Sequence, residues 1–135
     1  MSANAFFDTN VLVYVVGQKD ARTETAEALL AAGGAISVQV LNELASVSRK
    51  KLGMSWEEVS DALTAIRTFC PSPVPLTTDT HEAGLRIAAK YGYSIYDGLI
   101  AAAALEAECD TLYSEDLQDG QLIEGSLTIR NPFLR

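Results

Sequence analysis

Histidine and cysteine, two side chains that often bind zinc, are scarce in this sequence. His81 is the only histidine, and the two cysteines, Cys70 and Cys109, have neither a Cys-x-x-Cys spacing nor a histidine cluster near them. Zinc sites of the histidine-rich kind are therefore excluded. A catalytic triad could use only His81, and no nucleophile-elbow pattern accompanies it. We expect both cysteines to be buried free thiols.

Long apolar runs and an N-terminal targeting segment are also lacking. No apolar run reaches the ~18 residues of a membrane-spanning helix. The opening "MSANAFF" has neither the basic nor the apolar region of a signal peptide, so we expect a cytoplasmic protein with no membrane partner. The 135 residues suffice for one sizeable core, and no linker, repeat or low-complexity tract divides them. We therefore expect a single domain over residues 1–135.

Positive charge is in short supply, with 10 Lys and Arg residues against 18 Asp and Glu residues and a net charge of −8. This balance argues against a broad surface for nucleic acids, which normally requires basic residues. It also fits a protein whose acids gather around metal ions, because bound cations invert the local electrostatics. Three basic residues do occur together, at Arg49, Lys50 and Lys51. They could be a solvated helix end or could hold a substrate phosphate.

Short apolar segments alternate with longer helical patterns along the chain. The expected strands span residues 5–8 (a strand that could run on to residue 13), 35–41, 111–116 and 126–132, and the expected helices span residues 20–34, 42–53, 55–70, 76–92 and 94–109. Ser55 with Glu58 forms a capping box, Ser94 is a second N-cap, and Thr78 or Asp79 is a third. Residues 115–125 form the longest expected loop. This alternation predicts an α/β fold with a mostly parallel sheet.

Four carboxylates stand where such a sheet builds its site, beyond the carboxyl ends of the strands. Asp8 follows the apolar start of the first strand, Asp116 follows "TLY", and Asp97 and Glu43 lie near helix starts. Each of the last three has an ordinary alternative as a turn, capping or solvated residue, but Asp8 interrupts an apolar strand. If the four meet, their repulsion requires a cation between them. All-oxygen ligands suit Mg²⁺ or Mn²⁺, which could activate water for phosphodiester cleavage.

Four motifs carry a resemblance to a known family. "FFDTNVLVY", "QVLNE", "YDGLIAAAA" and "YSEDLQDG" occur in the order and spacing of the PIN domain, and specifically resemble the VapC-type toxin ribonucleases of toxin–antitoxin modules. The likeness runs from Phe6 to the terminal "NPF". It implies a three-layer α/β/α fold with a central, mostly parallel sheet. It also implies a metal-dependent endoribonuclease that hydrolyses RNA through a four-acid Mg²⁺ or Mn²⁺ site.

The resemblance assigns roles by position. The acids that it implies for catalysis and metal binding are Asp8, Glu43, Asp97 and Asp116, with Asp119 as a second-tier ligand or positioning residue. Three polar residues would support them: Thr9 and Ser114 match hydroxyl positions that hold ligands or water, and Asn10 matches the residue that orients the first acid. Asp8 would then stand at the strand end because a rigid sheet edge fixes it against the metal.

The resemblance implies partners as well. These are an RNA substrate, a small antitoxin whose Arg- or Lys-bearing tail blocks the acidic site, and a second copy of the chain, for which the helix around Trp56–Phe69 is a candidate interface. Two alternatives remain open at this point. One is a catalytically silent PIN-like module that binds RNA or protein. The other is a phosphatase with Asp8 as a covalent nucleophile, which is disfavoured because Asn10 stands where such enzymes carry a second aspartate.

Overall fold

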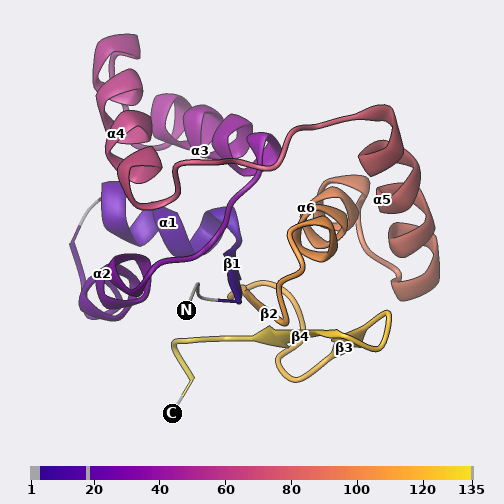
Figure 1. Cartoon of the computed structure of the whole chain (residues 1–135). Helices are drawn as coiled ribbons and strands as arrows, with labels where there is room; N and C mark the ends of the chain where they lie inside the picture. The colour runs from indigo at the N-terminus through magenta and orange to yellow at the C-terminus, as the bar shows by residue number, and fades with distance from the viewer. Residues whose placement is uncertain (1–3, 18, 135) are drawn as a thin grey trace.

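Six helices and four short strands make up the described part of the chain, which in this computed structural model comprises residues 4–17 and 19–134. The helices are α1 (Thr9–Val16), α2 (Thr23–Ala32), α3 (Val38–Lys50), α4 (Trp56–Phe69), α5 (Thr78–Tyr91) and α6 (Ile95–Glu106). The strands are β1 (Ala5–Phe7), β2 (Thr111–Tyr113), β3 (Leu122–Ile123) and β4 (Leu127–Arg130). Figure 1 shows α1 to α4 grouped together on one side, and α5 and α6 paired on the other.

The sheet has the order β1-β2-β4-β3, with β1, β2 and β4 parallel and β3 antiparallel to β4. Its central residues Phe6, Leu112 and Ile129 stand side by side in the register and are fully buried. Parallel strands are covered by helices on both faces, which is why they read as continuous apolar runs. The predicted three-layer α/β/α fold with a mostly parallel sheet is confirmed.

The first strand is shorter than the sequence predicts. An extension to residue 13 is wrong, because β1 ends at Phe7 and α1 begins at Thr9. Asp8 has an extended backbone (φ −72°, ψ 156°), and its side chain accepts a hydrogen bond from the Thr9 N–H. This N-cap starts a helix, and Val11 and Leu12, which the sequence pattern placed on a strand, lie fully buried on α1.

The strand predicted over residues 35–41 is also wrong. Only isolated bridges form there, at Ala35 and Ser37. The Ser37 hydroxyl accepts a hydrogen bond from the Val40 N–H, so that α3 begins at Val38. β-branched residues favour strands only weakly, and a local cap can outweigh them.

The other helices lie close to their predicted ranges. The capping box of Ser55 and Glu58 begins α4, and the Ser94 hydroxyl caps α6, both as predicted. The N-cap of α5 is Thr77, one residue before the predicted Thr78. The predicted open loop over 115–125 contains β3, which pairs with β4 through a turn that was not foreseen.

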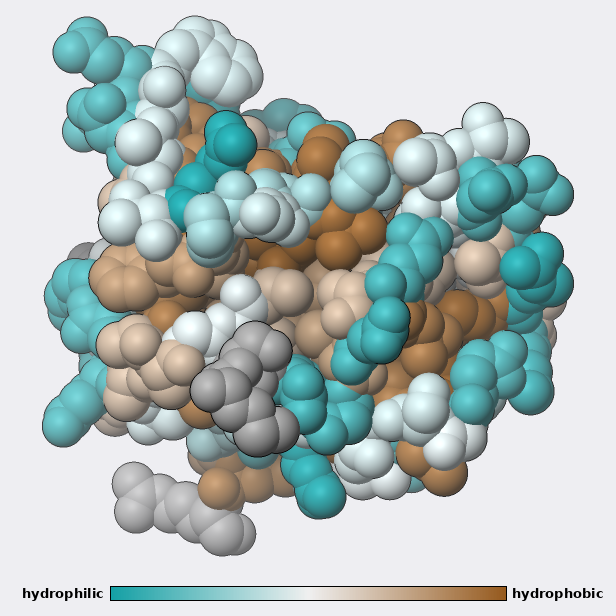
Figure 2. Space-filling model, viewed as in Figure 1, coloured by the Kyte–Doolittle hydropathy of each residue, from teal (hydrophilic) through white to brown (hydrophobic). Residues whose placement is uncertain are grey.

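Helix α6 is the apolar centre of the α5–α6 side. Its residues from Gly98 to Ala104 are buried, and Gly98 packs against Gly84 of α5 so closely that a Cβ built at Gly98 would lie 2.3 Å from the Gly84 carbonyl oxygen. Apolar side chains gather in the middle of the face shown in Figure 2, with hydrophilic residues around them. Within the described ranges no helix combines the length and apolar character needed to cross a bilayer.

Candidate active site

A pocket of about 320 Å³ lies beyond the carboxyl ends of β1 and β2, where a parallel sheet places its site. All four predicted acids line it, each from a different element: Asp8 after β1, Glu43 on α3, Asp97 in the first turn of α6, and Asp116 after β2. The fold therefore brings together carboxylates that are far apart in the sequence.

Asp8 is the most constrained of these acids, with 3% of its surface exposed. Its Oδ1 accepts the Thr9 N–H at 2.7 Å, and its Oδ2 accepts the Ser114 hydroxyl at 2.8 Å and the Asn10 amide at 3.2 Å. Asn10 in turn accepts the Glu115 N–H through its own Oδ1 at 3.0 Å. These donors fix both oxygens of Asp8 and join the ends of β1 and β2.

Ser114 fixes the backbone of the turn that carries Asp116. Its oxygen accepts the N–H groups of Asp116, at 3.3 Å, and Leu117, at 3.2 Å, while its hydroxyl donates to Asp8. A single fully buried hydroxyl thus ties the turn that carries Asp116 to the carboxylate of Asp8. Sequence reasoning assigned Ser114 a supporting position, and its contacts are of that kind.

Glu43 is held by two neutral donors. The Thr9 hydroxyl donates to its Oε1 and the Gln39 amide donates to its Oε2, each at 3.0 Å. Gln39 lies one turn before Glu43 on the same face of α3 and is 8% exposed. Its position was not singled out from the sequence, although the spacing of four residues would have been informative once α3 was known to begin at Val38.

Asp97 presents its carboxylate to the pocket from the start of α6. Its backbone N–H donates to the Ser94 hydroxyl at 3.2 Å, and no hydrogen bond to its carboxylate is found among the described residues. Burial raises its pKa, and the negative charges of Glu43 and Asp116 raise it further against the lowering effect of Ser94. Asp97 is thus destabilised as an anion by the other acids of the pocket.

Burial has a larger effect on Asp8, whose pKa it raises from 3.8 to about 7. The hydrogen bonds from Ser114 and Thr9 lower this pKa, while Asp97 and Glu43 raise it. Within residues 4–17 and 19–134, no Lys or Arg forms an ion pair with any of the four acids. The acids that line the pocket outnumber its lysine, Lys51, so the pocket holds an excess of negative charge, which a bound cation would relieve.

The donor set fits a hard divalent cation in kind, because carboxylate oxygens are the ligands that Mg²⁺ and Mn²⁺ prefer. As the side chains stand, however, no group of three or more acidic, histidine or cysteine side chains in the described chain converges closely enough to hold an ion. Binding would require Glu43, Asp97 and Asp116, of which only Asp116 is exposed, to come closer to Asp8.

Asp119 lies apart from these acids. It does not line the pocket, and its Oδ1 accepts the Asn131 N–H at 2.8 Å in the segment that follows β4. Its position suits a residue that shapes the rim of the site. A direct role toward a metal remains a prediction.

Two members of the basic cluster at residues 49–51 have different surroundings in the structure. Lys51 lines the acidic pocket, whereas the Arg49 guanidinium lies 5.0 Å from the centre of the Trp56 ring and donates to the Met54 carbonyl. Glu43, Val47 and Lys51 are spaced four residues apart, and all three line the pocket; Lys51 is the C-cap of α3. The sequence pointed to the cluster but not to this one member.

Comparison with known proteins places the fold in a family. The model of the PIN domain matches residues 5–118. No curated protein matches the sequence.

Three solved structures have the same fold. A toxin–antitoxin complex from Klebsiella pneumoniae superposes with a TM-score of 0.71 at 22% identity, covering 96% of this chain and 98% of that one. VapC20 of Mycobacterium tuberculosis, a sarcin–ricin loop cleaving toxin, gives 0.68 at 24% identity, with 83% and 89% covered. VapBC2 from Rickettsia felis, bound to a DNA fragment from its promoter, gives 0.66 at 23% identity, with 94% and 97% covered.

Proposed function

This chain belongs to the PIN domain family, and on that premise we propose that it is a metal-dependent endoribonuclease and the toxin of a type II toxin–antitoxin pair. One observation carries the proposal: four carboxylates from four separate elements line a single pocket at the ends of the parallel strands. A phosphatase with Asp8 as nucleophile fits less well, because Asn10, which donates to Asp8, stands where such enzymes carry a second aspartate.

The residues divide into those that would hold Mg²⁺ or Mn²⁺ and those that orient them. Asp8, Asp97 and Asp116 would be ligands, and Glu43 would be a ligand or would position the attacking water. When bound, the metal supplies the positive charge that activates water and stabilises the leaving oxygen. Thr9, Asn10 and Ser114 keep the acids in place through the hydrogen bonds described above. Such support limits the rearrangement required when substrate binds.

The likeness of this fold to toxin–antitoxin complexes supports a protein partner for the same pocket. A small antitoxin could insert an Arg or Lys side chain among the uncompensated acids, where it would replace the charge of the metal. A second copy of the chain is proposed to associate through α4, whose two end residues, Trp56 and Phe69, are 65% and 48% exposed. Exposed aromatic residues are frequent at protein interfaces.

Cleavage of labelled total RNA by the purified, antitoxin-free chain tests the proposal. We expect discrete fragments in Mn²⁺ and intact RNA in EDTA. Asp97→Asn removes one charge and no described hydrogen bond to the carboxylate, so it should abolish cleavage without unfolding the protein. Asp79→Asn makes the same change at an exposed position in the first turn of α5 and is the matched control. Cleavage by Asp97→Asn at the parental rate would contradict the assignment.

A further inference from the structure

A second hollow of about 370 Å³ adjoins the acidic pocket and shares Glu43 with it. Its walls are Gln39, Asn42, Glu43 and Ser46 from α3, and Tyr96 from α6. We call this hollow the Tyr96 subsite. Asn42, Ser46 and Tyr96 take no part in the arrangement of the acids, so the catalytic pocket does not account for them.

One face of α3 runs along both hollows. Gln39, Glu43, Val47 and Lys51 recur every four residues along the helix, and each lines the acidic pocket, the Tyr96 subsite or both. At 1.5 Å of rise per residue this stripe is about 18 Å long. The stripe ends in a cation at Lys51, the C-cap of α3, on the side of the acidic pocket, and in an amide at Gln39, on the side of the Tyr96 subsite.

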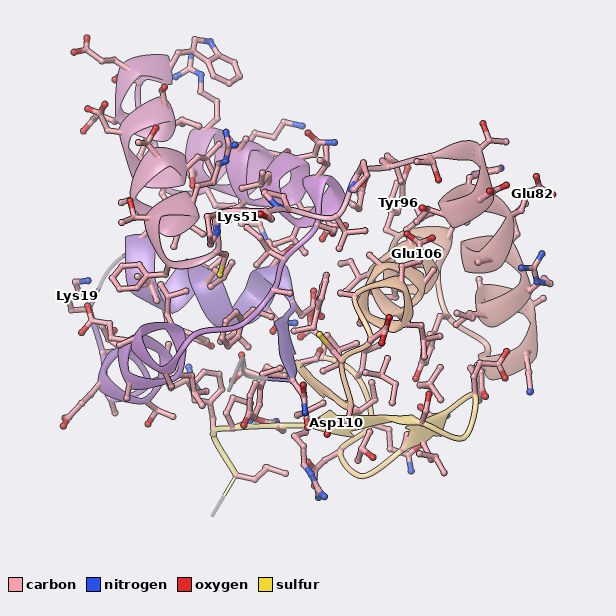
Figure 3. All side chains as sticks on the ribbon, in the orientation of Figure 1. Lys19, Lys51, Glu82, Tyr96, Glu106 and Asp110 are labelled. Atoms are coloured by element: carbon pink, nitrogen blue, oxygen red, sulfur yellow. The ribbon has the colours of Figure 1, made fainter. Side chains whose placement is uncertain are left out.

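Tyr96 lies at the amide end, across from α3. Figure 3 shows Tyr96 at the start of α6 and Lys51 at the far end of α3, on opposite sides of the space between these helices. The ring of Tyr96 is 59% exposed, and neither its hydroxyl nor the Asn42 amide makes a hydrogen bond within the described ranges. An exposed aromatic ring beside an exposed amide offers one surface for stacking and one group that can both donate and accept.

These features match the chemistry of an unpaired nucleobase. Bases of single-stranded RNA stack on aromatic side chains and present their edges to polar groups, whereas the edges of a duplex are poorly accessible. A lysine suits the phosphate backbone, which carries no base identity. The spacing along α3 would let one strand contact both ends while its backbone crosses the acids.

We propose that the Tyr96 subsite binds the base of the nucleotide next to the cleaved phosphate of a single-stranded RNA, stacked on Tyr96 with its edge toward Asn42, while Lys51 contacts a phosphate at the other end of the stripe. The inference rests on the proposed ribonuclease function. It adds which side chains hold the base and the backbone of the RNA on either side of the acids.

Binding of an end-labelled, single-stranded oligouridine RNA to the full chain tests this inference by fluorescence anisotropy. Ca²⁺, which also takes oxygen ligands, replaces Mn²⁺, and a gel verifies that the RNA stays intact. Tyr96→Ala should weaken binding about tenfold, and Tyr96→Phe, which keeps the ring, by no more than about twofold. Leu85→Ala removes an exposed apolar residue on α5, outside both hollows and outside α4, and should leave binding unchanged.

Two further measurements separate stacking from a disturbance of the neighbouring Asp97. An RNA lacking one base next to the cleaved phosphate should bind the parent about tenfold more weakly, yet bind Tyr96→Ala as the intact RNA does. Lys51→Gln should reduce the slope of log binding constant against log salt concentration by about 0.7, the value for one phosphate contact on a single strand.

The cleavage assay in Mn²⁺, run in parallel, keeps the two proposals distinct. If the parent cleaves RNA and Tyr96→Ala binds it as tightly as Tyr96→Phe does, the subsite is wrong and the ribonuclease stands. If the parent cleaves nothing but binding depends on the Tyr96 ring, the subsite stands and the catalytic proposal falls. Equal binding of a matched duplex and the single strand by the parent would overturn the subsite.

Discussion

The Ser114 hydroxyl donates a hydrogen bond of 2.8 Å to Oδ2 of Asp8, 106 residues away in the sequence. This bond links the end of β2 to the end of β1 inside a site where Ser114 is fully buried and Asp8 nearly so. Because the same Ser114 oxygen accepts the Asp116 N–H, it couples two of the four acids. The geometry of the site therefore depends on a side chain that is not itself acidic.

Ser114→Ala tests this coupling. The substitution deletes one donor to Asp8 and the acceptor for two backbone N–H groups, so we expect a loss of about 1–3 kcal/mol in the free energy of unfolding. RNA cleavage should fall as well, because Asp8 and the turn of Asp116 lose their common anchor. Urea denaturation and initial cleavage rates measure the two effects. Parental activity in a destabilised Ser114→Ala protein would limit Ser114 to the fold.

The pKa of Asp8 predicts an unusual pH dependence of stability. Burial raises this pKa from 3.8 to about 7, so between these values the folded chain keeps a proton that the unfolded chain releases. Asp8 therefore stabilises the fold less as pH rises through this range. In metal-free buffer, the stability of Asp8→Asn relative to the parent should rise by about 2–4 kcal/mol between pH ~4 and pH ~8.

Urea denaturation in EDTA across this pH range makes the comparison, and the same series in Mg²⁺ is the control. Asparagine also caps helices well, so α1 should persist in Asp8→Asn. A bound cation should favour the charged parent and reduce or reverse the advantage of the variant. An advantage for Asp8→Asn that does not change with pH would show that Asp8 is ionised throughout.

Asp116 and Asp119 are three residues apart but should differ in importance. Asp116 lines the acidic pocket, whereas the carboxylate of Asp119 accepts a hydrogen bond from the Asn131 N–H. We expect Asp116→Asn to lower kcat about a hundredfold and Asp119→Asn to lower it by no more than about tenfold. Single-turnover cleavage at saturating Mn²⁺ measures both. Equal losses would place Asp119 among the direct ligands.

The crossing of α5 and α6 should not tolerate a methyl group at Gly98. A Cβ there would lie 2.3 Å from the Gly84 carbonyl oxygen, a backbone atom that cannot move aside alone. Gly98→Ala should cost about 3 kcal/mol or more and displace the adjacent Asp97, lowering RNA cleavage. Gly84→Ala should cost less, since its nearest neighbour at 2.8 Å is the end of the Leu99 side chain.

Gly53→Ala serves as the control for backbone conformation in that comparison. Gly53 has φ +66°, and no heavy atom lies within 4 Å of the place that a Cβ would occupy, so alanine there should cost about 1–2 kcal/mol from its backbone alone. Gly53 lines neither hollow, so cleavage should change less than in Gly98→Ala. Thermal unfolding and cleavage rates of Gly98→Ala, Gly84→Ala and Gly53→Ala distinguish steric crowding between α5 and α6 from strain in the backbone.

The sequence predicted the acids better than it predicted the elements that carry them. Asp8, Glu43, Asp97 and Asp116 were found because each follows an apolar segment or opens a helix, and that logic depends only on the carboxyl edge of the sheet. Residues 38–41 were expected in a strand, and the first strand was allowed to run on over residues 9–13, because both segments are rich in β-branched and apolar residues. Both segments are helical, since Asp8 and Ser37 cap them and their apolar side chains face a core that helices also fill.

The second error concealed part of the site. With a strand expected up to residue 41, Gln39 and Glu43 belonged to different elements, and the stripe that continues to Lys51 could not be seen. Its spacing of four residues has meaning only on a helix that begins at Val38. Thr77 and the β3–β4 turn were missed although both are local. The Thr77 hydroxyl accepts the N–H of Thr80, three residues on, and neighbouring threonines offer the same cap; β3 has only two residues, too few for a sequence pattern to show.

The burial of Asp8 has a consequence for the descent of this chain. An aspartate there costs stability whenever no cation is near, and asparagine would cap α1 as well without a charge to bury. In a lineage released from selection for activity, position 8 should therefore drift toward asparagine, since most proteins retain destabilising residues only where function requires them. The aspartate at this position is therefore what the proposed metal site predicts.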